Sequence, residues 1–151
     1  MAPQPIAASL LISAPPPLVY GIIADYRQGH PQILPTPPFV SLAVEQGGVG
    51  AGTRFLAQIK MLGSTQSFRG VVSEPQPGHT LVETTDSGIV TSFIVEPRDD
   101  GRQSYVTISS QLAGRSGPLG ALERWVYGRM LRPVYARELA QLAGVAARQS
   151  R

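Results

Sequence analysis

The chain contains no cysteine and only two histidines, His30 and His79. The lack of cysteine excludes disulfide frameworks, zinc knuckles, iron–sulfur sites and catalysis by a thiol. Two histidines also make a histidine-rich metal site a poor fit to this sequence. We therefore expect no metal ligands and no cofactor.

Charge is scarce as well, since only 15% of the 151 residues are charged, against about a quarter in average proteins. The 13 basic and 10 acidic residues leave a net charge of +3. The basic residues are scattered from Arg27 to Arg151 rather than gathered on a stripe with aromatic residues between them. This pattern argues against a nucleic-acid partner. Apolar residues make up 42% of the chain, which is enough to build a folded core.

A targeting signal and a membrane-spanning segment are not expected either. The first 26 residues hold no lysine or arginine, so a signal peptide would lack its basic start. Pro15, Pro16 and Pro17 interrupt the apolar stretch there, and no run approaches the roughly 18 apolar residues of a membrane span. We expect a cytoplasmic protein without an integral membrane segment.

The length of the chain fits one domain over residues 1–151. Residues 5–13 are predicted as a strand, and helical spacing of apolar residues predicts a helix over about 16–26. Residues 28–35 fit a second short helix or a turn. Alternation of apolar and polar residues then predicts six strands joined by short turns, which should pair as an antiparallel meander, over residues 39–46, 53–61, 65–74, 79–85, 89–97 and 103–113.

The last forty residues are predicted to form a long helix that starts at Ser116-Gly117-Pro118. Its first half carries an apolar stripe of Leu119, Leu122, Val126 and Met130, and its second half has a stripe in a different direction. Because Pro133 lies between the halves, we expect a bend or a break there. This helix is the only predicted element large enough to cover the sheet, so the fold class is α+β.

The order of elements, together with motifs along nearly the whole chain, is similar to the Bet v 1-like/START-like (SRPBCC) superfamily, in particular its polyketide cyclase/dehydrase and lipid-transport branch. The resembling residues are Ile12-Ser13-Ala14-Pro15, Asp25-Tyr26, His30-Pro31, Leu34-Pro35, Gly50-Ala51-Gly52-Thr53, Val72-Ser73-Glu74-Pro75, Leu81-Val82-Glu83 and Glu138-Leu139-Ala140-Gln141-Leu142.

This resemblance implies a helix-grip fold, in which a curved antiparallel sheet of about seven strands wraps around a long C-terminal helix, with two short helices after the first strand. It also implies a deep cavity for an apolar ligand between sheet and helix. It supplies no universal catalytic residue, and we assign none.

Three classes of function remain open. The first is binding or transport of a small hydrophobic or amphipathic ligand, such as a lipid, a polyketide or a quinone-like molecule. The alternative is an enzyme, a polyketide cyclase or dehydratase that uses the same cavity. An interaction protein with a filled core is the third. A dinucleotide site is not expected, because the glycines from Gly47 to Gly52 lack the required spacing and precede a strand.

The predicted ligand-binding residues come from the concave face of the sheet and from the long helix. Large side chains around small ones on the sheet should leave a void, and the helix should close it. The predicted set is Phe55, Ala57, Ile59, Phe68, Gly70, Val72, Leu81, Glu83, Thr91, Phe93, Ile108, Leu122, Trp125, Val126 and Met130.

Glu83 is the one charge in a predicted row across the sheet. A Gly63-Ser64 turn would pair Ala57 with Gly70, and the next turns would extend this row to Glu83, Thr91 and Ile108. Its direction depends on the register, because a slip of one residue would turn Glu83 outward to a surface arginine. If it points inward, Glu83 and Thr91 are polar anchors for the ligand.

The sequence allows two interpretations of His30. It lies close to Asp25 and Tyr26, and a carboxylate could orient its ring for acid–base chemistry. The simpler hypothesis, which we favour, is a residue at a helix end near the mouth of the cavity.

Overall fold

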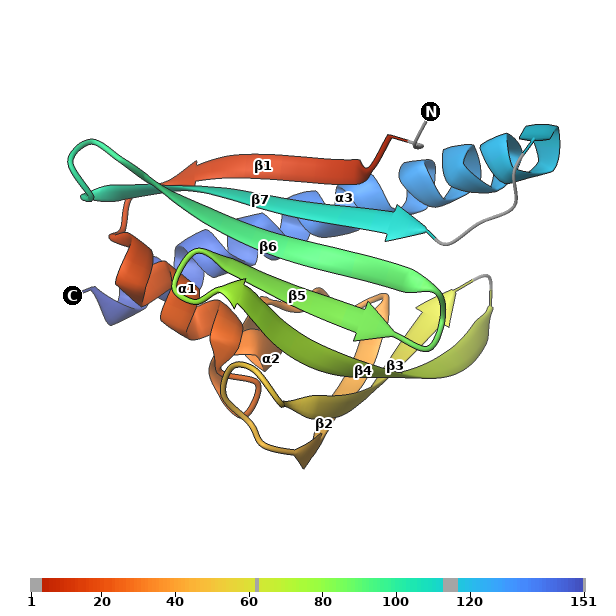
Figure 1. Ribbon diagram of the computed structural model, residues 1–151, viewed down its shortest axis with the longest axis horizontal. Helices are drawn as coiled ribbons and strands as arrows, with labels where there is room; N and C mark the ends of the chain where they lie inside the picture. Colours follow the sequence, from red (N-terminus) through yellow and green to blue (C-terminus); the bar gives the residue numbers. More distant parts are fainter. Residues whose placement is uncertain (1–3, 62, 113–116, 151) are drawn as a thin grey trace.

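The computed structural model describes residues 4–61, 63–112 and 117–150. The N-terminal strand β1 (Ile6–Ile12) is followed by two short helices, α1 (Pro16–Ala24) and α2 (Gly29–Ile33), and the chain ends in the long helix α3 (Gly117–Gln149). Between them run β2 (Phe39–Gln46), β3 (Arg54–Met61), β4 (Ser64–Gln76), β5 (Thr80–Thr85), β6 (Ile89–Arg98) and β7 (Gln103–Leu112) (Figure 1). This is the predicted order of elements. Ser116, in the predicted helix start, lies outside the described residues.

The seven strands form one antiparallel sheet in the order β1-β7-β6-β5-β4-β3-β2. The predicted meander from β2 to β7 is confirmed, and β1 joins it by pairing with β7. Alternation produces the two faces of the sheet. In β7, for example, Val106 and Ile108 are buried, and Thr107 between them is partly exposed. The sheet curves around α3, which packs along β1, so the predicted α+β helix-grip fold is confirmed (Figure 1).

The register of the sheet agrees with the prediction between β5 and β6, where Glu83 pairs with Thr91. At the other predicted pairs it is wrong by two residues. Met61 pairs with Ser64, so the hairpin turns earlier than a Gly63-Ser64 turn would, and Ala57 pairs with Phe68. The partners nearer the middle of the sheet are correspondingly Val72 for Glu83, Ser110 for Thr91 and Ile108 for Phe93. Because side chains alternate with a period of two, this shift leaves each residue on its predicted face.

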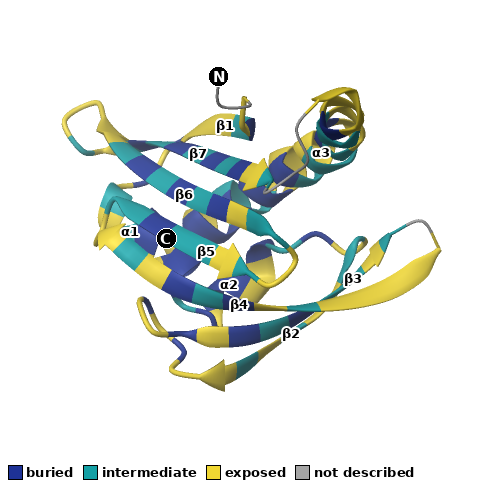
Figure 2. Ribbon diagram, turned by 45° about the vertical axis from the view of Figure 1, so that its right-hand side comes forward, coloured by how far each residue is buried: buried dark blue, intermediate teal, exposed yellow. Residues whose placement is uncertain are grey.

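Helix α3 runs without interruption through Pro133, so the predicted break is wrong, whereas the alternative of a bend there stays a prediction. Pro133 lies on an exposed side of the helix. Its ring removes one backbone hydrogen bond, and the carbonyl that loses its partner on that side can bond to water. Burial divides the helix into two parts. Most of its buried side chains belong to the half after Pro133, whereas much of the first half is exposed (Figure 2).

The apolar core fills the part of the molecule in which α1 and the second half of α3 lie against the sheet. Its fully buried members include Val19 and Ile23 of α1, Val106 of β7 and Leu142 of α3. The core therefore occupies one end of the space between sheet and helix, and the other end stays open.

No helix within the described part of the chain is long and apolar enough to cross a membrane.

Candidate functional site

A cavity of about 580 Å³ lies between the concave face of the sheet and α3. This volume falls within the range of roughly 300–1,000 Å³ that is usual for small-molecule sites. The lining is largely apolar and comes from the loop after α2, from the strands and from α3. Its apolar members include Leu34, Phe39, Leu42, Phe55, Ala57, Ile59, Phe68, Phe93, Leu112, Tyr127, Met130, Leu131 and Val134.

Part of the predicted binding set lines this cavity. The structure brings together Phe55, Ala57, Ile59, Phe68, Glu83, Thr91, Phe93 and Met130. Four further predicted residues on the sheet, Gly70, Val72, Leu81 and Ile108, are buried but do not border the cavity. Val72, Leu81 and Ile108 belong to the packed core instead.

Gly70 does not leave the void that its size suggested. The ring of Phe55, its partner in β3, covers it so closely that an added Cβ atom would lie 2.3 Å from Phe55 Cζ. The aromatic ring therefore fills the space that the missing side chain would have opened. The void begins on the other side of this ring, where Phe55 itself borders the cavity.

Of the four predicted helix residues, Met130 borders the cavity and the other three do not. Leu122, Trp125 and Val126 do not border the cavity, and their exposed fractions are 56%, 60% and 39%. The face that does border it includes Tyr127 and Leu131. At about 100° per residue, Trp125 lies roughly 160° around the helix from Tyr127. Except at Met130, the apolar pattern therefore identified the outer face of this half of α3.

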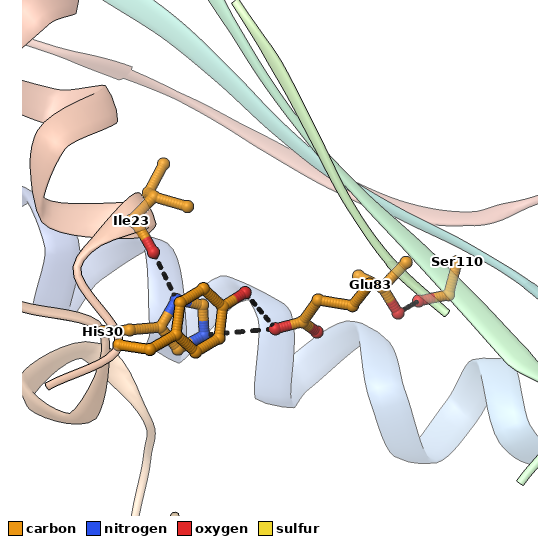
Figure 3. A network of polar contacts seen from close by, with 6 residues as sticks. Ile23, His30, Glu83 and Ser110 are labelled. Atoms are coloured by element: carbon orange, nitrogen blue, oxygen red, sulfur yellow. Dashed lines mark hydrogen bonds and ion pairs between the residues drawn. The ribbon is translucent and has the colours of Figure 1, made fainter. Parts of the chain in front are cut away.

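The buried end of the cavity holds a polar cluster centred on Glu83 of β5. The hydroxyl group of Tyr26 donates a hydrogen bond to Glu83 Oε2 across 2.5 Å. His30 Nε2 lies 3.6 Å from the same oxygen, which is too long for a hydrogen bond (Figure 3). The predicted inward direction of Glu83 is thus confirmed, and its side chain is 14% exposed.

His30 is held from behind by the backbone. Its Nδ1 lies 2.7 Å from the carbonyl oxygen of Ile23, so Nδ1 carries the hydrogen and donates it (Figure 3). Burial lowers the pKa of His30, while Glu83 and the Ile23 carbonyl act in the opposite direction. The ring is therefore neutral at neutral pH, with the lone pair of Nε2 directed to the carboxyl side of the cavity.

The less favoured hypothesis, in which the Asp25 carboxylate orients His30, is wrong. Asp25 Oδ1 instead accepts hydrogen bonds from the backbone N–H groups of Arg27 and Gln28, which shape the turn after α1. His30 lies in α2, as the helix-end hypothesis required, but it is only 2% exposed and borders the buried end of the cavity.

Close packing fixes Tyr26 and His30 relative to each other. Their rings stack with centroids 4.3 Å apart, and Phe55 stacks on the other side of Tyr26 at 5.4 Å. The backbone N–H of Tyr26 donates to the carbonyl of Gly48. Gly29, directly before His30, packs so tightly on α1 that an added Cβ would lie 2.4 Å from the Ile22 carbonyl oxygen. A side chain at position 29 would therefore displace His30.

Glu138 of α3 is a buried polar residue of the cavity that the sequence analysis did not assign to the site. It borders the cavity, is 3% exposed, and makes no hydrogen bond to any residue that the structure describes, and its carboxyl oxygens reach the open space of the cavity rather than being shut off from solvent. Burial, and then the nearby carboxyl of Glu83, raise its pKa well above the ordinary value. A signal was present, since Glu138 lies three residues after Tyr135 and four before Leu142, within the apolar stripe of the second half of α3.

A row of hydroxyl groups completes the polar cluster. Thr91 Oγ1 and Ser110 Oγ lie 2.6 Å apart, and Ser110 also bonds to the hydroxyl group of Tyr135. Burial raises the pKa of Tyr135 to about 12, so its hydroxyl keeps its hydrogen at neutral pH. Thr91 and Tyr135 both border the cavity, and Thr91 was predicted as a polar anchor.

Comparisons with known proteins agree with this geometry. The family model described as "Polyketide cyclase / dehydrase and lipid transport" matches residues 4–147. The solution structure of the KanY protein is similar, with 26% sequence identity, a TM-score of 0.83, and coverage of 97% of this chain and 99% of that one. No curated protein matches the sequence.

Two more distant structures share the fold. The aromatase/cyclase ZhuI from Streptomyces sp. R1128 is 14% identical, with a TM-score of 0.76 and coverage of 98% of this chain and 96% of that one. A START superfamily protein from Mycobacterium smegmatis is 12% identical, with a TM-score of 0.72 and coverage of 97% and 99%. At these identities the likeness shows the fold alone.

Proposed function

The chain belongs to the polyketide cyclase/dehydrase and lipid-transport family, and from this premise we propose that it binds one small amphipathic molecule in the cavity beneath α3. The observation that carries the proposal is a space of about 580 Å³ whose walls are largely apolar and whose buried end is polar. A solid core, as an interaction protein would have, does not fit this space. The ligand places its apolar body against the sheet and its polar group near Glu83.

Apolar surface supplies most of the affinity in this proposal. Removing such surface from water stabilises the complex by about 25 cal/mol per Å², before the cost of ordering the ligand is subtracted. Phe55, Ile59, Phe68 and Phe93 form the apolar contacts. Glu83, Thr91 and His30 then set the orientation of the ligand through hydrogen bonds.

The first experiment is native mass spectrometry of freshly purified protein, joined to titration with an apolar fluorescent dye. We expect a co-purified small molecule, or a dye that binds the folded protein and is displaced by such a molecule. Ala57→Phe should abolish dye binding, because Ala57 is 2% exposed and borders the cavity. Ala43→Phe, the same change at an exposed position of β2, is the matched control.

The proposal fails if the folded protein neither carries a ligand nor binds the dye. It fails equally if Ala57→Phe binds the dye as tightly as the unmodified protein does. A thermal melt of each variant shows whether it is folded, and hence whether the loss of binding reports on the cavity.

A second candidate is catalysis in the same cavity, by a polyketide cyclase or dehydratase. One observation favours it: the Nε2 lone pair of neutral His30 and the protonated carboxyl of Glu138 border one space. Nε2 could take a proton from a carbon beside a carbonyl group, and Glu138 could give its proton to the oxygen that leaves as water. The test is incubation with a β-hydroxyketone. Loss of one water that requires His30, while His30→Gln still binds the substrate, would establish the enzyme.

A further inference from the structure

The polar end of the cavity has two carboxyl groups and, among the described residues, no buried cation to balance them. Glu83 and Glu138 both border the space, and they interact electrostatically. The basic residues among the described lining are Lys60, Arg124 and Arg137, and none of them is buried. His30 is buried there, but its ring is neutral at neutral pH. We propose that the polar group of the ligand is a protonated amine, held between Glu83 and Glu138; this rests on the proposed function.

Glu138 is the strongest reason for this choice of ligand. The residue is only 3% exposed, it borders the cavity, and its carboxyl forms no hydrogen bond with a described residue. Because no described side-chain oxygen or nitrogen is both shut off from solvent and without a partner, the carboxyl oxygens reach the open space of the cavity. A ligand that fills this space removes the solvent there and must itself supply the hydrogen-bond partner. A ligand in the cavity is the partner that the structure leaves room for. An ammonium group would supply both a hydrogen and a charge.

The neighbours of Glu138 are rich in acceptors. Glu83 Oε2 accepts from Tyr26, but no described residue bonds to Glu83 Oε1. His30 Nε2 offers a lone pair close to the same carboxyl. An ammonium group has three hydrogens to donate, whereas a hydroxyl group has one and a carboxylate has none. The amine is therefore the simple ligand group that can satisfy Glu83, Glu138 and His30 together.

The walls beside this cluster also suit a cation. Phe55 and Phe93 border the cavity, and the ring of Phe93 lies 5.4 Å from that of His30. Aromatic faces attract ammonium groups within about 6 Å of the ring centre, and more strongly where water is excluded. A ligand carboxylate, by contrast, has no hydrogen to donate to Glu83 or His30 and would bring a negative charge beside the Glu83 carboxyl. The proposed ligand is thus an amine with an apolar body that fits the rest of the cavity.

Binding of an ammonium group should release a proton from the protein. In the free state Glu138 holds its proton, since burial and Glu83 favour the neutral form. The titratable groups around it are Glu83 from β5, Tyr135 from its own helix, Tyr26 from the turn after α1 and, on the same cavity, His30 from α2. None of them carries a positive charge at neutral pH, and the basic residues of the lining are not buried, so the ligand would bring the first cation to the buried end. Glu138 then ionises, and its proton passes to the buffer.

The test uses three probes with the same apolar chain: octylamine, octanol and octanoate. We expect octylamine to bind at least about tenfold more tightly than octanol, and octanoate to bind most weakly. Calorimetry in two buffers of different ionisation enthalpy should show net proton release with octylamine alone.

Glu138→Gln should weaken the binding of octylamine by about tenfold and change the affinity for octanol by no more than about twofold. Glu45→Gln, at an exposed carboxyl of β2, is the matched control.

The possible outcomes separate the two proposals. If octanol binds as tightly as octylamine, and Glu138→Gln affects both alike, the proposal that the ligand carries an amine is overturned. The proposal that the cavity binds a ligand then still stands. If no probe binds and the apolar dye fails as well, the proposed function falls. Should Glu138→Gln not fold, the comparison of probes and the proton release on the unmodified protein still decide the question.

Discussion

Tyr26 and Glu83, which lie 57 positions apart in the sequence, meet through a hydrogen bond of 2.5 Å from the Tyr26 hydroxyl to Glu83 Oε2. This contact joins the turn after α1 to β5 across the buried end of the cavity. It explains why a carboxyl group on the concave face is tolerated there, since a buried charge needs a donor close by. It also holds Tyr26 against His30, so the three side chains act as one unit.

Tyr26→Phe should destabilise the fold, because it leaves the Glu83 carboxyl without its donor while it keeps the stacked ring. We expect a loss of about 1–3 kcal/mol in the free energy of unfolding, as for a hydrogen bond to a charged group. Urea denaturation measures it. Tyr105→Phe is the control, because this residue is partly exposed on β7 and its ring contacts Arg98. Equal stability of the two variants would contradict the assigned role of the Tyr26 hydroxyl.

Gly70→Ala should disturb the cavity through Phe55. The new Cβ atom would lie 2.3 Å from Phe55 Cζ, so the ring must move away from β4 and toward the ligand space. We expect a loss of about 1–3 kcal/mol in stability, as for overpacking, together with weaker dye binding. Gly21→Ala is the matched control: nothing lies within 4 Å of its added Cβ, and alanine suits an exposed helix position. Tight dye binding by a stable Gly70→Ala would disprove the close packing.

The fold could be predicted because its signals are local. Alternation along β7 and the proline-rich entry to α1 each depend on neighbouring residues, and short turns force antiparallel pairing. The register was harder to predict, because moving the β3–β4 turn by one residue changes the partner of Ala57 from Gly70 to Phe68. This error shifts the pairing by two residues, so each side chain stays on its predicted face of the sheet, and the inward direction of Glu83 was still predicted correctly.

The residues that α3 contributes to the site could not be predicted from such local patterns. Leucine and tryptophan normally indicate a buried face, but Trp125 is exposed and the cavity side of α3 carries Gly120, Tyr127 and Glu138. Large apolar side chains such as Leu131 do lie on this face, but small and polar residues lie among them, so the face lacks the continuous apolar stripe of a core face. The contact of His30 with the Ile23 carbonyl depends on how α2 packs on α1, and no periodic pattern in the sequence predicts it.

The protonation of His30 gives a direct spectroscopic prediction. Because Nδ1 donates to the Ile23 carbonyl and burial lowers the pKa, Nδ1 should carry the hydrogen and Nε2 should be bare at pH 7. Nitrogen NMR of His79→Gln, in which His30 is the one histidine left, distinguishes the two ring nitrogens. A protonated Nε2 would contradict the lone pair that both the binding and the catalytic proposals use.

Glu138→Gln should change how stability depends on pH. Burial raises the folded pKa of Glu138 above its ordinary value of 4.5, so between these two values the folded chain holds a proton that the unfolded chain has lost. The unmodified protein therefore loses stability as pH rises above about 4.5, by about 1.4 kcal/mol for each pH unit, until the folded pKa is passed. Glutamine removes this loss, whereas the opposite effect of His30, whose folded pKa is lowered, is present in both proteins.

The stability of Glu138→Gln relative to the unmodified protein should therefore increase as the pH rises above about 4.5, and should level off once the folded pKa of Glu138 is passed. Urea denaturation across this range measures the difference. Glu45→Gln is the control, because this carboxyl is exposed in its ion pair with Arg69, and its removal should give a small difference that changes little with pH. A flat difference for Glu138→Gln would mean that Glu138 ionises in the folded protein as readily as in the unfolded chain. The proton that the amine is expected to displace would then not be there.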